Sequence, residues 1–132
     1  MTYVVAYIST AVVFLGLDAL WLGVVARAIY RRWIGHLMAD DINMMPAFWF
    51  YLAYVVGLVI FAVAPALGDG TWHTAAIYGA LFGLFAYGTY EMSNFATLRD
   101  WPVQMVVTDL AWGTILSAVS AFAGYSITRY LI

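Results

Sequence analysis

Three carboxylates, Asp18, Glu91 and Asp109, stand inside or at the edge of long apolar stretches of this sequence. A charge at the centre of a bilayer costs about 3 kcal/mol or more, so such residues usually face a bundle interior or a wet cavity. Trp21 and Trp112 follow the two aspartates by three residues, which puts each indole on the same helix face as its carboxylate. The spacing predicts two Asp-x-x-Trp elements that meet at similar depth.

Glu91 has further polar and aromatic neighbours at helical spacing. Tyr87 precedes it by one turn, Asn94 follows it by one turn, and Tyr90 adjoins it. We therefore expect one ligand-binding pocket with carboxylate, amide and aromatic walls. Its candidate residues are Asp18, Glu91, Asn94, Asp109, Tyr87, Tyr90, Trp21 and Trp112.

Two interpretations of the carboxylates stay open at this point. In the first, the acids share a proton or hold a hard cation through their oxygens. In the second, each acid only fastens the helices together by accepting from a tryptophan N–H or a hydroxyl, or by pairing with Arg99 in the loop before residue 103. Neutralisation of lipid phosphates is a further role for Arg99.

Other chemistry is not indicated. The sequence has no cysteine, which excludes disulfides, thiolate catalysis and zinc–cysteine sites. His36 and His73 are far apart, and no phosphate loop, HExxH or haem-attachment motif occurs. We expect no catalytic residue and no metal site, and the cofactor, if there is one, is unknown. A net charge of −2 with five basic residues also excludes a nucleic-acid partner.

The composition requires a lipid environment. Of the 132 residues, 66% are hydrophobic and only 9% are charged, whereas soluble domains carry about 25% charged residues. A chain this short cannot bury so much apolar surface in a water-soluble core. We predict an all-α integral membrane four-helix bundle, a single transmembrane domain over residues 1–132. Its spans lie at about residues 3–26, 47–67, 74–92 and 103–128.

A short amphipathic helix is predicted between the first two spans. Apolar and aromatic side chains recur at helical spacing from Ile29 to Met38, with arginines on other faces. We expect this helix to lie in the membrane interface. Small residues at Gly79 and Gly83, and at Gly113 and Ser117, predict close packing of the third and fourth spans within one chain or at a dimer seam.

Basic residues orient the bundle. The first loop holds Arg27, Arg31 and Arg32 and the third holds Arg99, while the second holds none and the C-terminus only Arg129. By the positive-inside rule the first and third loops are cytoplasmic and both termini are periplasmic. The three carboxylates then share the cytoplasmic half of a bacterial inner membrane.

The stretch from Gly83 to Gly124 also resembles a known family. The resemblance rests on Tyr90-Glu91, Asn94, Asp109 and Trp112-Gly113, and on the N-terminal Leu17–Leu22. These residues are similar to the signature of the bacterial membrane family called domain of unknown function 2177 (DUF2177). The resemblance implies a four-span inner-membrane protein of about this length, and it implies no activity.

The function we predict is a small multi-pass protein that binds or transports a small cation, a proton or an amphiphile. One alternative is an intramembrane lipid-modifying enzyme with a carboxylate as general base, although no activated serine, histidine or metal motif accompanies it. Another is an accessory subunit of a larger membrane complex. Membrane lipids are the expected partners, together with a homo-oligomer or a larger complex.

Overall fold

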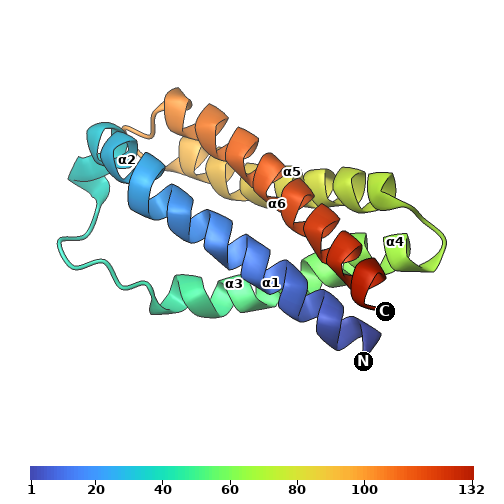
Figure 1. Cartoon of the computed structure of the whole chain (residues 1–132). Coiled ribbons are helices and arrows are strands. Elements are labelled where there is room, and N and C mark those ends of the chain that lie inside the picture. The colour runs from blue at the N-terminus through green and yellow to red at the C-terminus, as the bar shows by residue number, and fades with distance from the viewer.

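The computed structural model describes all residues from 1 to 132, and the chain is helical with no strand. The all-α prediction is confirmed (Figure 1). The elements are α1 (Thr2–Leu20), the π-helical turn η1 (Trp21–Val25), α2 (Ala26–Ile34), the 3₁₀ turn η2 (Gly35–Leu37), α3 (Met45–Leu58), the π-helical turn η3 (Val59–Val63), α4 (Ala64–Gly68), α5 (Trp72–Thr97) and α6 (Val103–Leu131).

Prolines and hydroxyls explain several of these boundaries. Pro46 occupies the first turn of α3, where the missing N–H is not needed. Thr71 and Thr74 form a reciprocal capping box that begins α5. The helix that begins at Met45 continues through Pro65 and ends at Gly68, close to the expected limits of 47–67. The π-helical turn η3 directly precedes Pro65, where a proline disturbs the backbone hydrogen bonds of the preceding turn.

Four long helical segments, called rods below, run alternately in opposite directions along the bundle. Three of them, Thr2–Leu37, Met45–Gly68 and Val103–Leu131, are long and apolar enough to cross a membrane. The fourth rod, α5, is not among them. Its 26 residues extend for about 39 Å and lie along α6. Both chain termini and α4 lie at one end of the bundle, and α2 lies at the other end with the α5–α6 connection (Figure 1).

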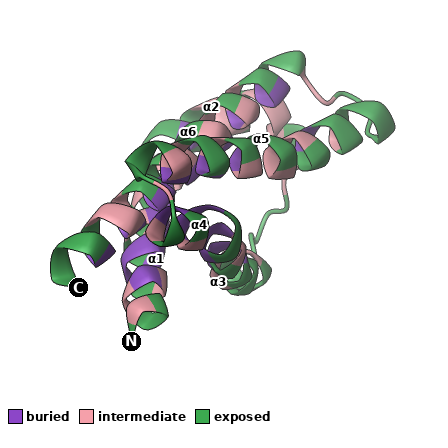
Figure 2. Ribbon diagram, turned by 90° about the vertical axis from the view of Figure 1, so that its right-hand side faces the viewer, coloured by how far each residue is buried: buried purple, intermediate pink, exposed green.

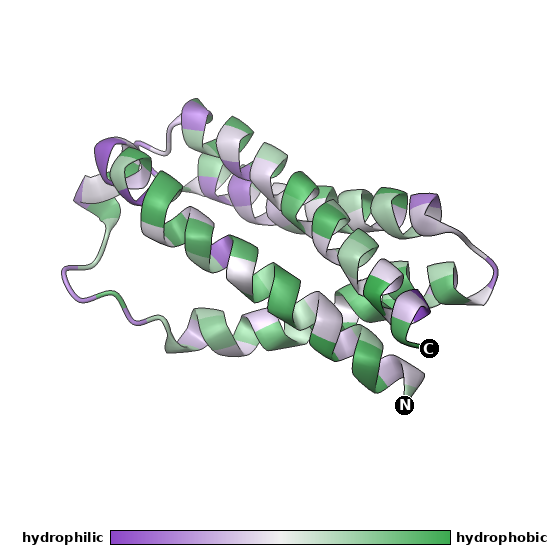
Figure 3. Cartoon of the chain, in the orientation of Figure 1, coloured by the Kyte–Doolittle hydropathy of each residue, from purple (hydrophilic) through white to green (hydrophobic).

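The expected amphipathic helix is α2, and it follows α1 through η1 without a loop. Its arginines, Arg27, Arg31 and Arg32, are exposed, whereas Ala26 is buried. In Figure 2 the buried residues line the inner faces of the helices and the outer faces are exposed. Figure 3 shows that most residues along the helices are hydrophobic and that hydrophilic residues gather mainly toward the ends of the rods. This distribution suits a molecule surrounded by lipid along its sides.

Small residues let α5 and α6 approach closely. A Cβ atom on Gly79 would lie 2.7 Å from the carbonyl oxygen of Ser117, and one on Gly83 would overlap the carbonyl oxygen of Gly113. The predicted packing of the two glycine stripes therefore occurs within one chain. At the other end of α6, Gly124 gives the same close approach to Thr10 of α1.

This seam gives a first prediction. Replacing Gly83 by alanine should lower stability by about 1–3 kcal/mol, because the added methyl overpacks the seam between α5 and α6. Gly88→Ala is the matched control on the same helix, since a Cβ atom there meets nothing within 4 Å. The measurement is thermal unfolding of both variants in nanodiscs. Equal melting temperatures for the two variants would show that the seam is not tightly packed.

Candidate functional site

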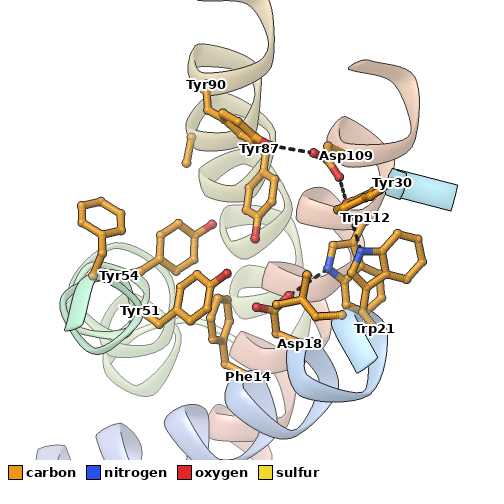
Figure 4. Close-up of a pocket in the computed structure, with 13 residues that line it drawn as sticks. Phe14, Asp18, Trp21, Tyr30, Tyr51, Tyr54, Tyr87, Tyr90, Asp109 and Trp112 are labelled. Carbon is orange, nitrogen blue, oxygen red and sulfur yellow. Dashed lines mark hydrogen bonds between the residues drawn. The ribbon is translucent and has the colours of Figure 1, made fainter. Parts of the chain in front are cut away.

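Asp18 and Asp109 line the same cavity, which is partly open to the outside of the bundle and has a volume of about 290 Å³. The cavity lies between α1, η1, α2, α3, α5 and α6 (Figure 4). Thirteen residues surround it, and apart from the two aspartates they are apolar or aromatic. Among them are Trp21, Trp112 and the tyrosines Tyr30, Tyr51, Tyr54, Tyr87 and Tyr90. The site is therefore a pair of acids inside an aromatic cage.

The two Asp-x-x-Trp elements meet because α1 and α6 run antiparallel. Trp21 and Trp112 stack face to face, with ring centroids 4.4 Å apart and planes inclined by 9°. Trp112 Nε1 donates a hydrogen bond to Asp18 Oδ1 at 3.2 Å. Trp21 Nε1 donates to the Tyr30 hydroxyl at 3.1 Å, and that hydroxyl in turn donates to Asp109 Oδ1. The Trp112 indole therefore holds Asp18 directly, and the Trp21 indole is joined to Asp109 through the Tyr30 hydroxyl.

The two aspartates differ in the hydrogen bonds that their carboxylate oxygens accept. Asp109 is 2% exposed, and both of its oxygens accept hydrogen bonds, Oδ1 from Tyr30 and Oδ2 from Tyr90 at 3.1 Å. Asp18 is 4% exposed, and its Oδ2 has no hydrogen-bond partner. In Figure 4 the Asp18 carboxyl lies between Tyr51 and Trp112. This oxygen is enclosed by protein atoms, and the Tyr51 hydroxyl lies close to the carboxyl.

No basic side chain neutralises either aspartate. The structure has one ion pair, between His36 and Asp100 at 3.8 Å, and both side chains are largely exposed. Arg99 is exposed in the α5–α6 connection and forms no ion pair, so the pairing considered for it does not occur. The cavity contains no lysine, arginine or histidine. Its fixed charge is therefore purely acidic.

Glu91 and Asn94 do not line the cavity. Glu91 is fully buried; its Oε1 accepts from Trp101 Nε1 at 2.8 Å and its Oε2 has no partner. Its carboxyl lies close to that of Asp109. Asn94 is partly exposed and makes no side-chain hydrogen bond. The structure thus brings six of the eight predicted residues to the cavity, places Glu91 beside it and leaves Asn94 outside.

Sequence reasoning missed several residues of the cage. Tyr51 and Tyr54 come from the charge-free second rod, where Tyr54 also shares a hydrogen bond of 2.7 Å with Ser117 Oγ. Their spacing of three residues was the one signal available. Tyr30 was assigned to the interfacial helix, but α2 places it over the cavity. The π-helical turn η1 separates Trp21 from α2, and such wide turns often occur at functional sites.

A comparison with models of known protein families finds a match. A family model described as "Predicted membrane protein (DUF2177)" matches residues 3–126. The chain belongs to this family. No curated protein and no solved structure matches it. With three rods able to span a bilayer, the chain is a membrane protein.

The hydrogen-bond chain through Tyr30 gives a second prediction. Tyr30→Phe removes the hydroxyl that joins Trp21 to Asp109 and leaves a buried carboxylate with one donor fewer. We expect a loss of about 1.5–3 kcal/mol, the range for hydrogen bonds to charged groups. Tyr78→Phe is the control, because Tyr78 is exposed on α5 and makes no side-chain hydrogen bond.

Thermal unfolding in nanodiscs measures the difference. If Tyr30→Phe melts at the same temperature as Tyr78→Phe, the hydroxyl does not stabilise Asp109.

Proposed function

We propose that the protein binds a small cation in this cavity, with Asp18 and Asp109 as its counter-charges. The observation that carries the proposal is that two buried aspartates line one cavity with no cationic side chain beside them. Uncompensated carboxylates are expensive in a low-dielectric interior. A bound cation would compensate them, and removal of the ligand would leave the charge to the hydrogen bonds alone.

The aromatic cage supports the same proposal. Ring faces attract a cation within about 6 Å of their centroids, most strongly when water is excluded. Tyr87 and the stacked Trp21–Trp112 pair lie on walls of the cavity that also carry the two aspartates. A cation at the centre would therefore meet acidic oxygens on one side and π faces on others.

The enzyme alternative receives less support. The cavity has two carboxylates that would serve as general bases, but no serine, lysine or histidine lines it as a nucleophile. No observation in the structure favours an accessory subunit over an independent protein. Cation binding remains the function that the geometry supports best.

The proposal includes the location of the site. We place the protein in the bacterial inner membrane with the α2 end in the cytoplasm and both termini in the periplasm. In support, Arg27, Arg31, Arg32 and Arg99 all lie at the α2 end, opposite the termini. A further hollow of about 570 Å³ reaches Arg27 and Arg31 and adjoins the cavity at Tyr30. This hollow would connect the site with the cytoplasmic interface.

Topology gives a third prediction. Reporter fusions at Gly70 and at the C-terminus should report a periplasmic location, and a fusion near Asp40 should report the cytoplasm, because the arginines hold the α2 end inside. Alkaline phosphatase and fluorescent-protein fusions measure this directly. A cytoplasmic signal from the Gly70 fusion would reverse the orientation and move the cavity to the periplasmic half.

Cation binding gives a fourth prediction. Purified protein in nanodiscs should bind at least one member of a panel made of tetramethylammonium, methylammonium, potassium and sodium. Asp18→Asn and Asp109→Asn should each weaken that binding at least about tenfold, or roughly 1.4 kcal/mol, because each removes a counter-charge. Asp41→Asn, in the exposed segment between η2 and α3, is the control and should bind as the wild type does.

Isothermal titration calorimetry supplies the affinities, and melting curves confirm that each variant is folded. The proposal fails if no ion of the panel binds, or if folded Asp18→Asn and Asp109→Asn proteins bind as tightly as the Asp41→Asn control.

A further inference from the structure

We infer that the ligand is an amphiphilic ammonium ion, whose head occupies the aromatic cage and whose apolar chain leaves the cavity between α1 and α3 toward the lipid. This inference rests on the proposed cation site and adds the chemical class of the ligand and its route. It begins from a second hollow, of about 280 Å³, that adjoins the cage.

The two spaces share a wall at Asp18. Asp18, Leu22 and Tyr51 line both the cage and the second hollow. Beyond them the second hollow is lined by apolar side chains only, which are Leu15 and Ala19 on α1 and Met44 and Phe48 near the start of α3. A molecule held at Asp18 therefore has a polar, aromatic space on one side and an apolar space on the other.

The head group is assigned from the free acceptor. Asp18 Oδ2 is buried without a partner, and an unsatisfied buried acceptor is unfavourable until a donor or cation reaches it. Both Asp109 oxygens are already occupied by tyrosine hydroxyls. Asp18 would then attract the ammonium group by its charge from the side of the second hollow, and Asp109 would contribute its charge across the cage.

A bare metal ion fits the cage less well. Hard cations take six or more oxygen ligands, and no cluster of three acidic or histidine side chains is present. The cage volume of about 290 Å³ equals that of roughly ten water molecules in the liquid. Its walls are mostly ring faces, which suit the diffuse charge of an organic ammonium ion.

The apolar chain is assigned from the side on which the second hollow opens. Met44 is 48% exposed and Phe48 is 44% exposed, and Ala19 is also exposed. These residues are therefore accessible from outside the bundle, where the surrounding lipid would lie. A ligand with an alkyl chain would place its head at Asp18 while its chain passes through the hollow into the bilayer.

The test compares two probes that differ only in their chain, tetramethylammonium and decyltrimethylammonium. Equilibrium binding of each radiolabelled ion is measured in phosphatidylglycerol nanodiscs, with protein-free nanodiscs subtracted to remove partition into lipid. Ala19→Phe fills the second hollow without lining the cage. Ala53→Phe adds the same bulk at an exposed position of α3 outside both spaces, and it is the matched control.

We expect Ala19→Phe to weaken decyltrimethylammonium binding at least tenfold and to change tetramethylammonium binding less than twofold. Ala53→Phe should change neither, and Asp18→Asn should weaken both. If Ala19→Phe does not fold, Ala19→Leu replaces it with the same expected order of effects.

Two further outcomes distinguish this inference from the cation-binding proposal on which it rests. If tetramethylammonium binds in an Asp18-dependent way and Ala19→Phe leaves decyltrimethylammonium unaffected, the chain does not use the hollow and this inference is wrong while the cation site stands. If neither ion binds in an Asp18-dependent way, the ammonium site itself is refuted, and any metal-ion binding from the panel decides whether a cation site remains.

Discussion

The structure depends on one constraint, which is that two aspartates must be held inside a lipid-embedded bundle without a basic partner. Neither Asp18 nor Asp109 has an ion pair, and both are almost fully buried. Hydrogen bonds from indoles and phenols replace the missing cation in part. Trp112 donates to Asp18 directly, and Trp21 is joined to Asp109 through the Tyr30 hydroxyl. Separation of α1 from α6 would therefore expose a carboxylate to hydrocarbon.

The remaining packing serves to keep this arrangement in register. Gly124 lets α6 contact Thr10 of α1, and the seam at Gly79 and Gly83 fixes α5 against α6. Gly113 sits against the Tyr87 ring, where any larger residue would displace that wall of the cage. Tight helix contacts thus surround an open centre. This combination of a dense periphery and a cavity lined by two acids supports the proposed binding site.

Helical periodicity made part of this site predictable. Asp18, Trp21, Asp109 and Trp112 lie on inward faces because three-residue spacing fixes their direction on any regular helix. Sequence spacing no longer predicts the direction of a side chain where the helix changes its pitch. The π-helical turn after Leu20 rotates α2, so Tyr30 reaches Asp109 although its spacing indicated an interfacial role.

Other features have no periodic signal at all. Glu91 is held by Trp101, which follows a loop where Asp100 adopts a left-handed backbone conformation with φ of 64°. A loop of this kind cannot be inferred from helix spacing. The second rod carries no charge, and as a result Tyr51 and Tyr54 were not distinguished from other lipid-facing aromatics.

The most direct test of the central claim is a double-mutant cycle on the two aspartates, with Asp18→Asn, Asp109→Asn and the combined variant unfolded thermally in nanodiscs. Residues that share a cavity and a network of donors couple by about 0.5–3 kcal/mol, whereas independent sites add. We predict a coupling free energy in that range, because the same stacked indole pair supports both carboxylates. Strictly additive losses would contradict a shared site and would mean that each aspartate fastens its own helix separately.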